Sequence, residues 1–255
     1  MSHKIFDLTN KTALCIGGAG GIGSESCIAL SEAGVNVIIA DLNVQKAEKL
    51  ADKCRSNNVE SMAIEVNVTQ EQSIDDMFSS IFNRFSKIDI LIYFVGYNNR
   101  QRISEFTKKE WEKTFEINMT GCFLVCKKMA EQMKKTGGGK IVITTSIQGV
   151  IANPLYSAYA ASKAAMIHFA KIAAQEWIED NIYVNSIAPT ATDTEFIQKF
   201  LKDNPGKREF FESNIPLGRI AKPFDYIGPI LFLCSKASDF LVGHCLFLDG
   251  GESIH

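Results

Sequence analysis

The sequence has few histidines and lacks the cysteine spacing of a zinc site. Its 255 residues include four histidines and seven cysteines, and no two cysteines form a Cys-x-x-Cys pair. An odd number of scattered thiols argues against a zinc site and against the disulfide framework of a secreted protein. We therefore expect reduced thiols, no bound metal and a cytoplasmic location.

An excess of charge of one sign is also missing. The 27 basic and 29 acidic side chains give a formal net charge of −2, which offers no electrostatic attraction for nucleic acid or an anionic membrane. The first residues contain no apolar segment of a signal peptide. The long uncharged stretch 141–162 contains Gln148, Asn153 and Pro154, which a membrane-spanning helix would not favour. The expected partner is a small-molecule substrate, with no nucleic acid and no membrane.

Short β-branched runs alternate with longer amphipathic stretches, and no linker or repeat divides the chain. Strands that are apolar on both faces and separated by helices indicate a parallel sheet covered on both sides. We therefore predict one α/β domain over 1–255, a doubly wound (Rossmann-type) fold with a seven-stranded parallel sheet flanked by helices. Strands are predicted at 12–17, 35–40, 61–66, 88–95, 140–145, 182–187 and 245–248. Helices are predicted at 22–33, 44–56, 71–85, 108–135, 157–177 and 224–234, and 188–214 is a long irregular or mixed connection of the kind that often forms a lid.

A glycine-rich run, GGAGGIG, directly follows the first predicted strand and opens the first helix. Glycine lets the backbone turn sharply and approach a pyrophosphate, whose charge is stabilised by the helix N-terminus. Such a run can also be a plain connection, but its place between a strand and a helix favours dinucleotide binding. The residues assigned to the cofactor here are Gly17, Gly20, Gly21, Ile22 and Gly23.

Asp41 ends the second predicted strand, eighteen residues after Gly23. A carboxylate at this position can accept hydrogen bonds from an adenosine ribose and would repel a 2′-phosphate. No Arg or Lys stands in the glycine run or directly after Asp41. The sequence thus favours NAD(H) over NADP(H), while Asp41 could instead be a turn residue or the N-cap of the next helix.

Tyr159 and Lys163 open a predicted helix and, four residues apart, share one face of it. A free phenol has a pKa of about 10, and a nearby positive charge favours the phenolate, which makes a usable general base. Ser146 lies thirteen residues earlier, at the end of the fifth predicted strand, where a hydroxyl could donate to a substrate oxygen. Asn118 lies inside a predicted helix, where asparagine is unfavourable.

Together these pieces resemble the short-chain dehydrogenase/reductase family over essentially the whole chain. The matching elements, in order, are Gly17-x-x-x-Gly21-Ile22-Gly23, Asp41, Asn118, Ser146, Tyr159 with Lys163, and VNSIAP ending at Pro189. The resemblance implies that Tyr159 is the catalytic acid/base, while Lys163 holds the nicotinamide ribose and lowers the Tyr159 pKa. It also implies that Ser146 orients the carbonyl and Asn118 anchors a relay water. Further cofactor contacts implied by the resemblance are Asn67, Val68, Gly96, Pro189, Thr192 and Thr194, together with Tyr159 and Lys163.

Several positions depart from the family pattern. Ile16 replaces a threonine, Asn67 replaces an aspartate, and Thr190 replaces the glycine after Pro189. Tyr93 and Phe94 replace two asparagines before Gly96. These changes cluster around the expected cofactor and leave the catalytic four (Asn118, Ser146, Tyr159, Lys163) intact.

For the substrate, segment 96–100, the Glu110-Trp111 pair and the ending SDFLVGHCLFLDGG are similar to sugar-acid and polyol dehydrogenases, such as gluconate and deoxygluconate dehydrogenases. Arg100 could pair with a substrate carboxylate, or be a solvated loop arginine. Gln148 is a second substrate candidate. The expected function is NAD(H)-linked interconversion of a secondary alcohol and a ketone on a small polar substrate.

Two alternatives stay open. A 3-oxoacyl-[acyl-carrier-protein] reductase would share the catalytic four, but the acidic end of the predicted catalytic helix (Glu176, Glu179, Asp180) does not suit an acidic carrier protein, and Asp41 disfavours NADPH. A non-catalytic homologue would bind only nucleotide or a protein. Small residues on the helices with Asn118 and Tyr159 fit a subunit interface, so we expect a homo-oligomer, a tetramer or a dimer.

Overall fold

The computed structural model describes residues 4–254, apart from the side chains of Phe196 and Lys199, and contains one seven-stranded sheet. All strand pairs are parallel, in the order β3-β2-β1-β4-β5-β6-β7. The predicted fold class is confirmed. The strands are β1 (Thr12–Ile16), β2 (Asn36–Asp41), β3 (Ser61–Glu65), β4 (Ile90–Tyr93), β5 (Gly139–Thr144), β6 (Ile182–Pro189) and β7 (Cys245–Leu248).

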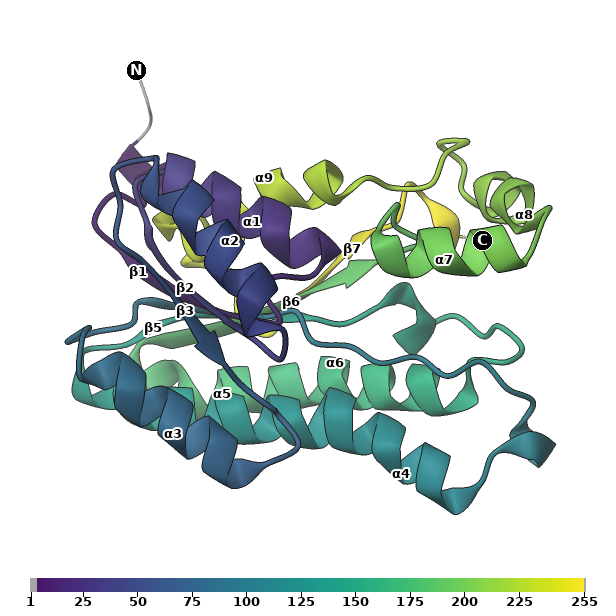
Figure 1. Cartoon of the computed structure of the whole chain (residues 1–255), viewed down its shortest axis with the longest axis horizontal. Coiled ribbons are helices and arrows are strands. Elements are labelled where there is room, and N and C mark those ends of the chain that lie inside the picture. The colour runs from purple at the N-terminus through teal and green to yellow at the C-terminus, as the bar shows by residue number, and fades with distance from the viewer. Residues whose placement is uncertain (1–3, 255) are drawn as a thin grey trace.

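Helices cover both faces of the sheet, with α1, α2 and α9 on one face and α3, α4, α5 and α6 on the other (Figure 1). Alternation along the strands produces the two cores: Leu14 of β1 points into the core under α3, α5 and α6, while its neighbour Cys15 points into the core under α1, α2 and α9. The helices are α1 (Gly21–Glu32), α2 (Val44–Arg55), α3 (Glu71–Phe82), α4 (Lys108–Phe115), α5 (Gly121–Lys135), α6 (Ser157–Trp177), α7 (Glu195–Asp203), α8 (Lys207–Asn214) and α9 (Ile227–Cys234).

The strand order reverses between β1 and β4, because the chain fills one half of the sheet with β2 and β3 before crossing to the other half. In a doubly wound sheet this reversal opens a crevice at the carboxyl ends of the strands. The segments that follow β1, β4, β5 and β6 all leave the sheet at that edge, so residues from distant parts of the sequence meet there.

The structure corrects some predicted element boundaries. The single helix predicted at 108–135 is α4, then a five-residue π-helical turn, Glu116–Thr120, then α5. The predicted strand 88–95 is shorter, since only Ile90–Tyr93 pairs as β4 before the chain turns towards the crevice. The connection 188–214 contains two helices, α7 and α8, as a mixed segment.

All seven cysteines are buried free thiols. Between residues 4 and 254, no helix combines the length and the apolar character that a membrane crossing requires.

Candidate active site

A cleft of about 1090 Å³ opens at the carboxyl edge of the sheet, beside the glycine loop that follows β1. Gly17 has a φ of +72°, and a Cβ there would lie 2.9 Å from a Val95 methyl carbon. A Cβ at Gly21 would lie 2.3 Å from Thr194 Cγ2. Helix α1 begins at Gly21 and its N-cap, Gly20, has no side chain to cap it, so its first N–H groups remain available to an anion. The loop therefore fits the pyrophosphate of a dinucleotide.

Asp41, at the end of β2, lies half-buried on the wall of this cleft. Its Oδ2 accepts a hydrogen bond from the Ala19 N–H at 3.0 Å, and its Oδ1 accepts one from the Asn43 N–H at 2.9 Å. The carboxylate thus ties the glycine loop to the end of β2. Each oxygen can accept a further bond, so this structural role leaves room for a ribose hydroxyl.

The next wall of the cleft comes from the end of β3 and from β4. Asn67, Val68 and Gly96 line it. The Asn67 Oδ1 accepts hydrogen bonds from the Thr69 N–H at 3.1 Å and the Thr69 hydroxyl at 2.8 Å. All three are predicted cofactor contacts, and Ile22 and Gly23 lie in α1 behind the glycine loop.

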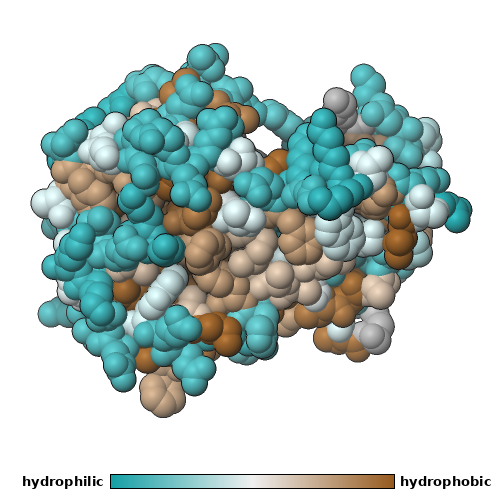
Figure 2. Space-filling view, turned by 90° about the horizontal axis from the view of Figure 1, so that it is seen from below, coloured by the Kyte–Doolittle hydropathy of each residue, from teal (hydrophilic) through white to brown (hydrophobic). Residues whose placement is uncertain are grey.

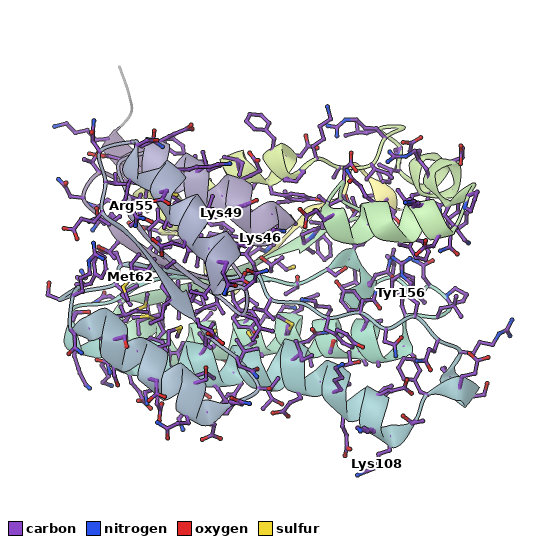
Figure 3. The ribbon with its side chains drawn as sticks, in the orientation of Figure 1. Lys46, Lys49, Arg55, Met62, Lys108 and Tyr156 are labelled. Carbon is purple, nitrogen blue, oxygen red and sulfur yellow. The ribbon has the colours of Figure 1, made fainter. Side chains whose placement is uncertain are left out.

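A basic group on α2 was missed by the sequence analysis. Lys46, Lys49 and Lys53 line a smaller cavity of about 440 Å³ together with Gly20 and Gly21. Lys46 and Lys49 project from α2 (Figure 3), and Lys46 pairs with Glu195 at the start of α7 at 2.5 Å. The signal in the sequence is the helical spacing of the three lysines. These lysines provide positive charge near the glycine loop, although no Arg or Lys directly follows Asp41 in the sequence.

Asn118 is fully buried within the π-helical turn between α4 and α5. Its Oδ1 accepts the Tyr97 N–H at 2.7 Å, while its Nδ2 donates to the Tyr97 carbonyl at 2.9 Å and to the Ser162 hydroxyl at 2.9 Å. π turns inside α-helices are frequent at functional sites. The turn explains how an asparagine that is unfavourable within a helix is accommodated here.

The departures at Ile16 and Tyr93 have a packing explanation. Both side chains are fully buried in the core beneath α3 and α5. The Tyr93 hydroxyl donates to the Ile117 carbonyl at 3.1 Å, within the π turn. Tyr93 therefore points away from the cleft and supports the turn that contains Asn118, while its neighbour Phe94 lies half-buried on the cleft wall.

Ser146, Tyr159 and Lys163 meet at the carboxyl end of β5. Lys163 is buried; its Nζ donates to the Thr144 carbonyl at 3.0 Å and lies 5.7 Å from the centre of the Tyr159 ring. Burial lowers the pKa of Lys163 to about 8. Burial also raises the pKa of Tyr159 to about 12, while the Ser146 hydroxyl acts to lower it. The lowering of the Tyr159 pKa by Lys163 stays a prediction.

The remaining predicted cofactor residues follow β6. Pro189 is the last residue of this strand and is buried. The Thr192 hydroxyl bonds to the Tyr226 hydroxyl at 2.7 Å, and Thr194 is the N-cap of α7 and faces Gly21. Thr194 lines the smaller cavity together with Gly20 and Gly21, and the contact of both threonines with the nicotinamide stays a prediction.

Of the two substrate candidates, Arg100 is the more informative. Its guanidinium carbon lies 3.8 Å from the centre of the Phe200 ring and 4.9 Å from that of Tyr156. Tyr156 lies in the gap between the α7 and α6 layers (Figure 3), and its ring centre is 6.2 Å from that of Tyr159. The Gln148 Oε1 accepts a hydrogen bond from Asn153 at 3.2 Å. The aromatic residues around Arg100 were not predicted, because they come from separate segments of the chain.

The described part of the chain contains no cluster of three or more His, Cys, Asp or Glu side chains that could hold a metal ion.

Comparison with known proteins places this geometry among nucleotide-dependent oxidoreductases. A family model described as "Enoyl-(Acyl carrier protein) reductase" matches residues 17–253. An NAD-dependent glycerol dehydrogenase of Listeria innocua is 34% identical over 98% of this chain and 97% of its own. A 3-oxoacyl-[acyl-carrier-protein] reductase of Aquifex aeolicus is 30% identical over 96% of this chain and 98% of its own.

A solved structure extends the likeness to the fold. A gluconate 5-dehydrogenase from Burkholderia cenocepacia, in complex with NADP and tartrate, has a TM-score of 0.93 and 30% sequence identity to this chain. The match covers 99% of this chain and 98% of that one.

Proposed function

This chain belongs to the short-chain dehydrogenase/reductase family and is an oxidoreductase of CH–OH groups, and from that premise we propose its cofactor, substrate class and catalytic residues. The cofactor is NAD(H). The substrate is a small polyhydroxylated compound, a sugar acid or a polyol, oxidised at a secondary alcohol or reduced at the ketone. Tyr159 transfers the proton.

The observation that carries the catalytic assignment is the single network around Tyr159. Lys163 lies beside the Tyr159 ring, and Asn118 bonds to Ser162, which precedes Lys163. The bound nicotinamide would supply or accept the hydride. In oxidation, Tyr159 acts as the phenolate and accepts the proton of the substrate hydroxyl, while the Ser146 hydroxyl donates to the substrate oxygen and orients it.

Substitution of Tyr159 by Phe tests this assignment. The variant loses only a hydroxyl, so we expect folding and NADH binding to be nearly unchanged while kcat falls by roughly two to four orders of magnitude. Steady-state kinetics and NADH fluorescence on the same preparation measure both effects. Turnover within a few-fold of the wild type would refute Tyr159 as the acid/base.

The substrate class follows from Arg100. Its guanidinium is half-buried and has no ion-pair partner in the described part of the chain. It is held by Tyr156, whose ring neighbours that of Tyr159. A half-buried guanidinium favours a planar anion such as a carboxylate. The glycerol dehydrogenase and the gluconate 5-dehydrogenase among the similar proteins support a polyol or sugar-acid substrate.

The choice of NAD(H) rests on Asp41 at the cofactor cleft. One similar protein is named as NAD-dependent and another was solved with NADP. The free oxygen lone pairs of Asp41 favour a ribose 2′-hydroxyl over a 2′-phosphate.

The main alternative is reduction of 3-oxoacyl groups on an acyl carrier protein. Glu176 and Glu179 are exposed at the end of α6, roughly 25 Å along the helix from Tyr159, and Asp180 is paired with Lys134 at 3.0 Å, so the acidic end of α6 does not argue against a carrier at the site. NADH-dependent reduction of acetoacetyl thioesters, compared with NAD⁺-dependent oxidation of gluconate and polyols, distinguishes the two activities. A non-catalytic homologue would change NADH fluorescence little at millimolar cofactor, or would bind NADH and turn over none of these compounds.

A further inference from the structure

Thr190 and Glu252 form a polar pair that none of the assignments above uses. Thr190 replaces the glycine of the family pattern directly after Pro189, and its hydroxyl donates to the Glu252 carboxylate. Glu252 comes from the turn that follows β7, the strand next to β6. The unusual threonine and the acidic side chain are therefore parts of one arrangement.

Strand register places this pair next to the catalytic residues. Thr144 of β5 pairs with Ile187 of β6, and Pro189 of β6 pairs with Leu248 of β7. The Thr145 N–H also donates to the Ile187 carbonyl at 2.8 Å, so Ser146 and Thr190 follow neighbouring strands at the carboxyl edge of the sheet. The hydrogen bond from Thr190 brings the Glu252 side chain to this edge.

The turn that contains Glu252 is held in place from both sides. The Leu217 N–H donates to the Gly250 carbonyl at 3.2 Å, and Asp249 accepts the N–H groups of Gly251 and Ser253. The turn, in yellow in Figure 1, lies beside α7 and α8. Its position is fixed by backbone contacts, so the Glu252 side chain is not required for the turn itself.

Glu252 is half-buried and, within residues 4–254, forms no ion pair. Burial raises its pKa, and the Thr190 hydroxyl acts to lower it. Burial also raises the pKa of Tyr156, while the Arg100 charge lowers it and the Glu252 charge raises it. Arg100 and Glu252 thus both act on the phenol beside Tyr159, yet they do not pair with each other. Both charges therefore lie near Tyr156, whose ring centre is 6.2 Å from that of Tyr159.

We propose that Glu252, oriented by Thr190, is a specificity-determining residue that accepts hydrogen bonds from substrate hydroxyls at the side of the site away from Arg100. This inference rests on the proposed function and deepens it. A substrate with a carboxylate at one end and several hydroxyls along its length matches a guanidinium and a carboxylate that both lie near Tyr156. That chemistry describes an aldonic acid or its keto form. Hydrogen bonds from hydroxyls to a carboxylate are charge-assisted, so they add selectivity as well as affinity.

The test compares three compounds with the holoenzyme at saturating NAD⁺. D-gluconate has a carboxylate and several hydroxyls, D-glucitol has hydroxyls only, and 3-hydroxybutyrate has a carboxylate and one hydroxyl. KM is measured for each compound that is turned over, and Ki as a competitive inhibitor for each that is not. The variants are Glu252→Gln, Thr190→Val and Arg100→Gln, and the control is Glu209→Gln, an exposed acidic residue on α8.

We expect Glu252→Gln to raise the KM or Ki for gluconate and for glucitol by about tenfold or more, and to change the value for 3-hydroxybutyrate by less than twofold. Thr190→Val should give the same pattern more weakly. Arg100→Gln should raise the KM or Ki for gluconate and 3-hydroxybutyrate and leave that for glucitol unchanged. Glu209→Gln should change none of these values. If Glu252 had a purely structural role, Glu252→Gln would change the KM or Ki of all three compounds by the same factor.

The outcomes separate this inference from the proposed function. If the wild type binds NADH but turns over neither gluconate nor glucitol, the proposed substrate class is wrong. If the wild type is active and Glu252→Gln affects the three compounds equally, or none of them, the inference about Glu252 is wrong while the proposed function stands.

Discussion

At the scale of single residues, Asp41 has two tasks that can be separated by experiment. Its carboxylate bonds to the Ala19 and Asn43 N–H groups and faces the cofactor cleft. Removing the charge in Asp41→Ala should narrow the preference for NAD over NADP by roughly tenfold, because a 2′-phosphate is no longer repelled. The lysines of α2 at the glycine loop would then favour the phosphate. The ratio of kcat/KM for the two cofactors measures this effect.

The control for Asp41 is Asp52→Ala, an exposed acidic residue on α2 that pairs with Arg55. It changes the charge of the same region without touching the cleft, so its cofactor ratio should equal that of the wild type. An unchanged ratio in Asp41→Ala would mean that Asp41 does not contact the ribose.

Lys163 predicts a pH dependence of stability whose sign follows from its burial. Burial lowers the folded pKa of Lys163 to about 8, from the ordinary lysine value of 10.5. Between these two pH values the unfolded chain binds more protons, so the free energy of unfolding should rise with pH in that window. Below pH 8 the cost of burying the charge is fully present. Urea titrations at pH 7.5 and pH 9.5 should show a smaller rise in the free energy of unfolding for Lys163→Met than for the wild type. Equal rises would contradict a lowered pKa for Lys163.

At the scale of elements, the π turn depends on Tyr93. Its hydroxyl donates to the Ile117 carbonyl, one residue before Asn118. In Tyr93→Phe this carbonyl loses its donor in a buried environment, which should lower the free energy of unfolding by about 1–3 kcal/mol. Because Asn118 is positioned by the same turn, kcat should also fall.

A matched control is Ile81→Val, a buried residue of the same core that does not touch the turn. It should cost a comparable ~0.5–1.5 kcal/mol of stability while leaving kcat unchanged. Equal kcat in Tyr93→Phe and Ile81→Val at matched stability would show that Tyr93 does not position Asn118.

The π turn also illustrates what hydrophobic periodicity leaves undetected. A single inserted residue shifts the apolar pattern of 108–135 too little to be noticed, so the segment reads as one helix. The only sign was Asn118, a residue that competes for backbone groups inside helices. The glycine loop was easier, because Gly17 and Gly21 face close contacts that exclude every larger residue.

At the scale of the whole molecule, the alternation of buried strands and helices predicted the parallel fold, since each strand is apolar on both faces. The order of the strands was not predicted, and residues that meet only through that order were missed. The aromatic residues around Arg100 come from the start of α6 and from α7 and α8. The Thr190–Glu252 pair joins β6 to the turn after β7. Local sequence patterns do not predict such contacts between distant segments of the chain.

The assembly is the last expectation, and the face formed by α4, α5 and α6 argues for it. Figure 2 shows apolar side chains gathering on this side of the molecule, bordered by hydrophilic ones. Phe123 of α5 is 41% exposed, Ile172 of α6 is 43% exposed, and Phe123 packs against Phe169 of α6. Exposed apolar side chains that gather on one face are typical of a subunit interface.

We therefore expect the wild type to elute with a mass that is a multiple of the 28.2 kDa chain, a dimer or a tetramer. The double variant Phe123→Glu with Ile172→Lys places charges where a second copy would pack, so it should lower that mass. Light scattering after size-exclusion chromatography measures it. Phe224→Glu, at a side chain that is 75% exposed beside α9 on the opposite face, should leave the mass unchanged. If the wild type is monomeric at micromolar concentration, or if only Phe224→Glu dissociates it, this helical face is not the interface.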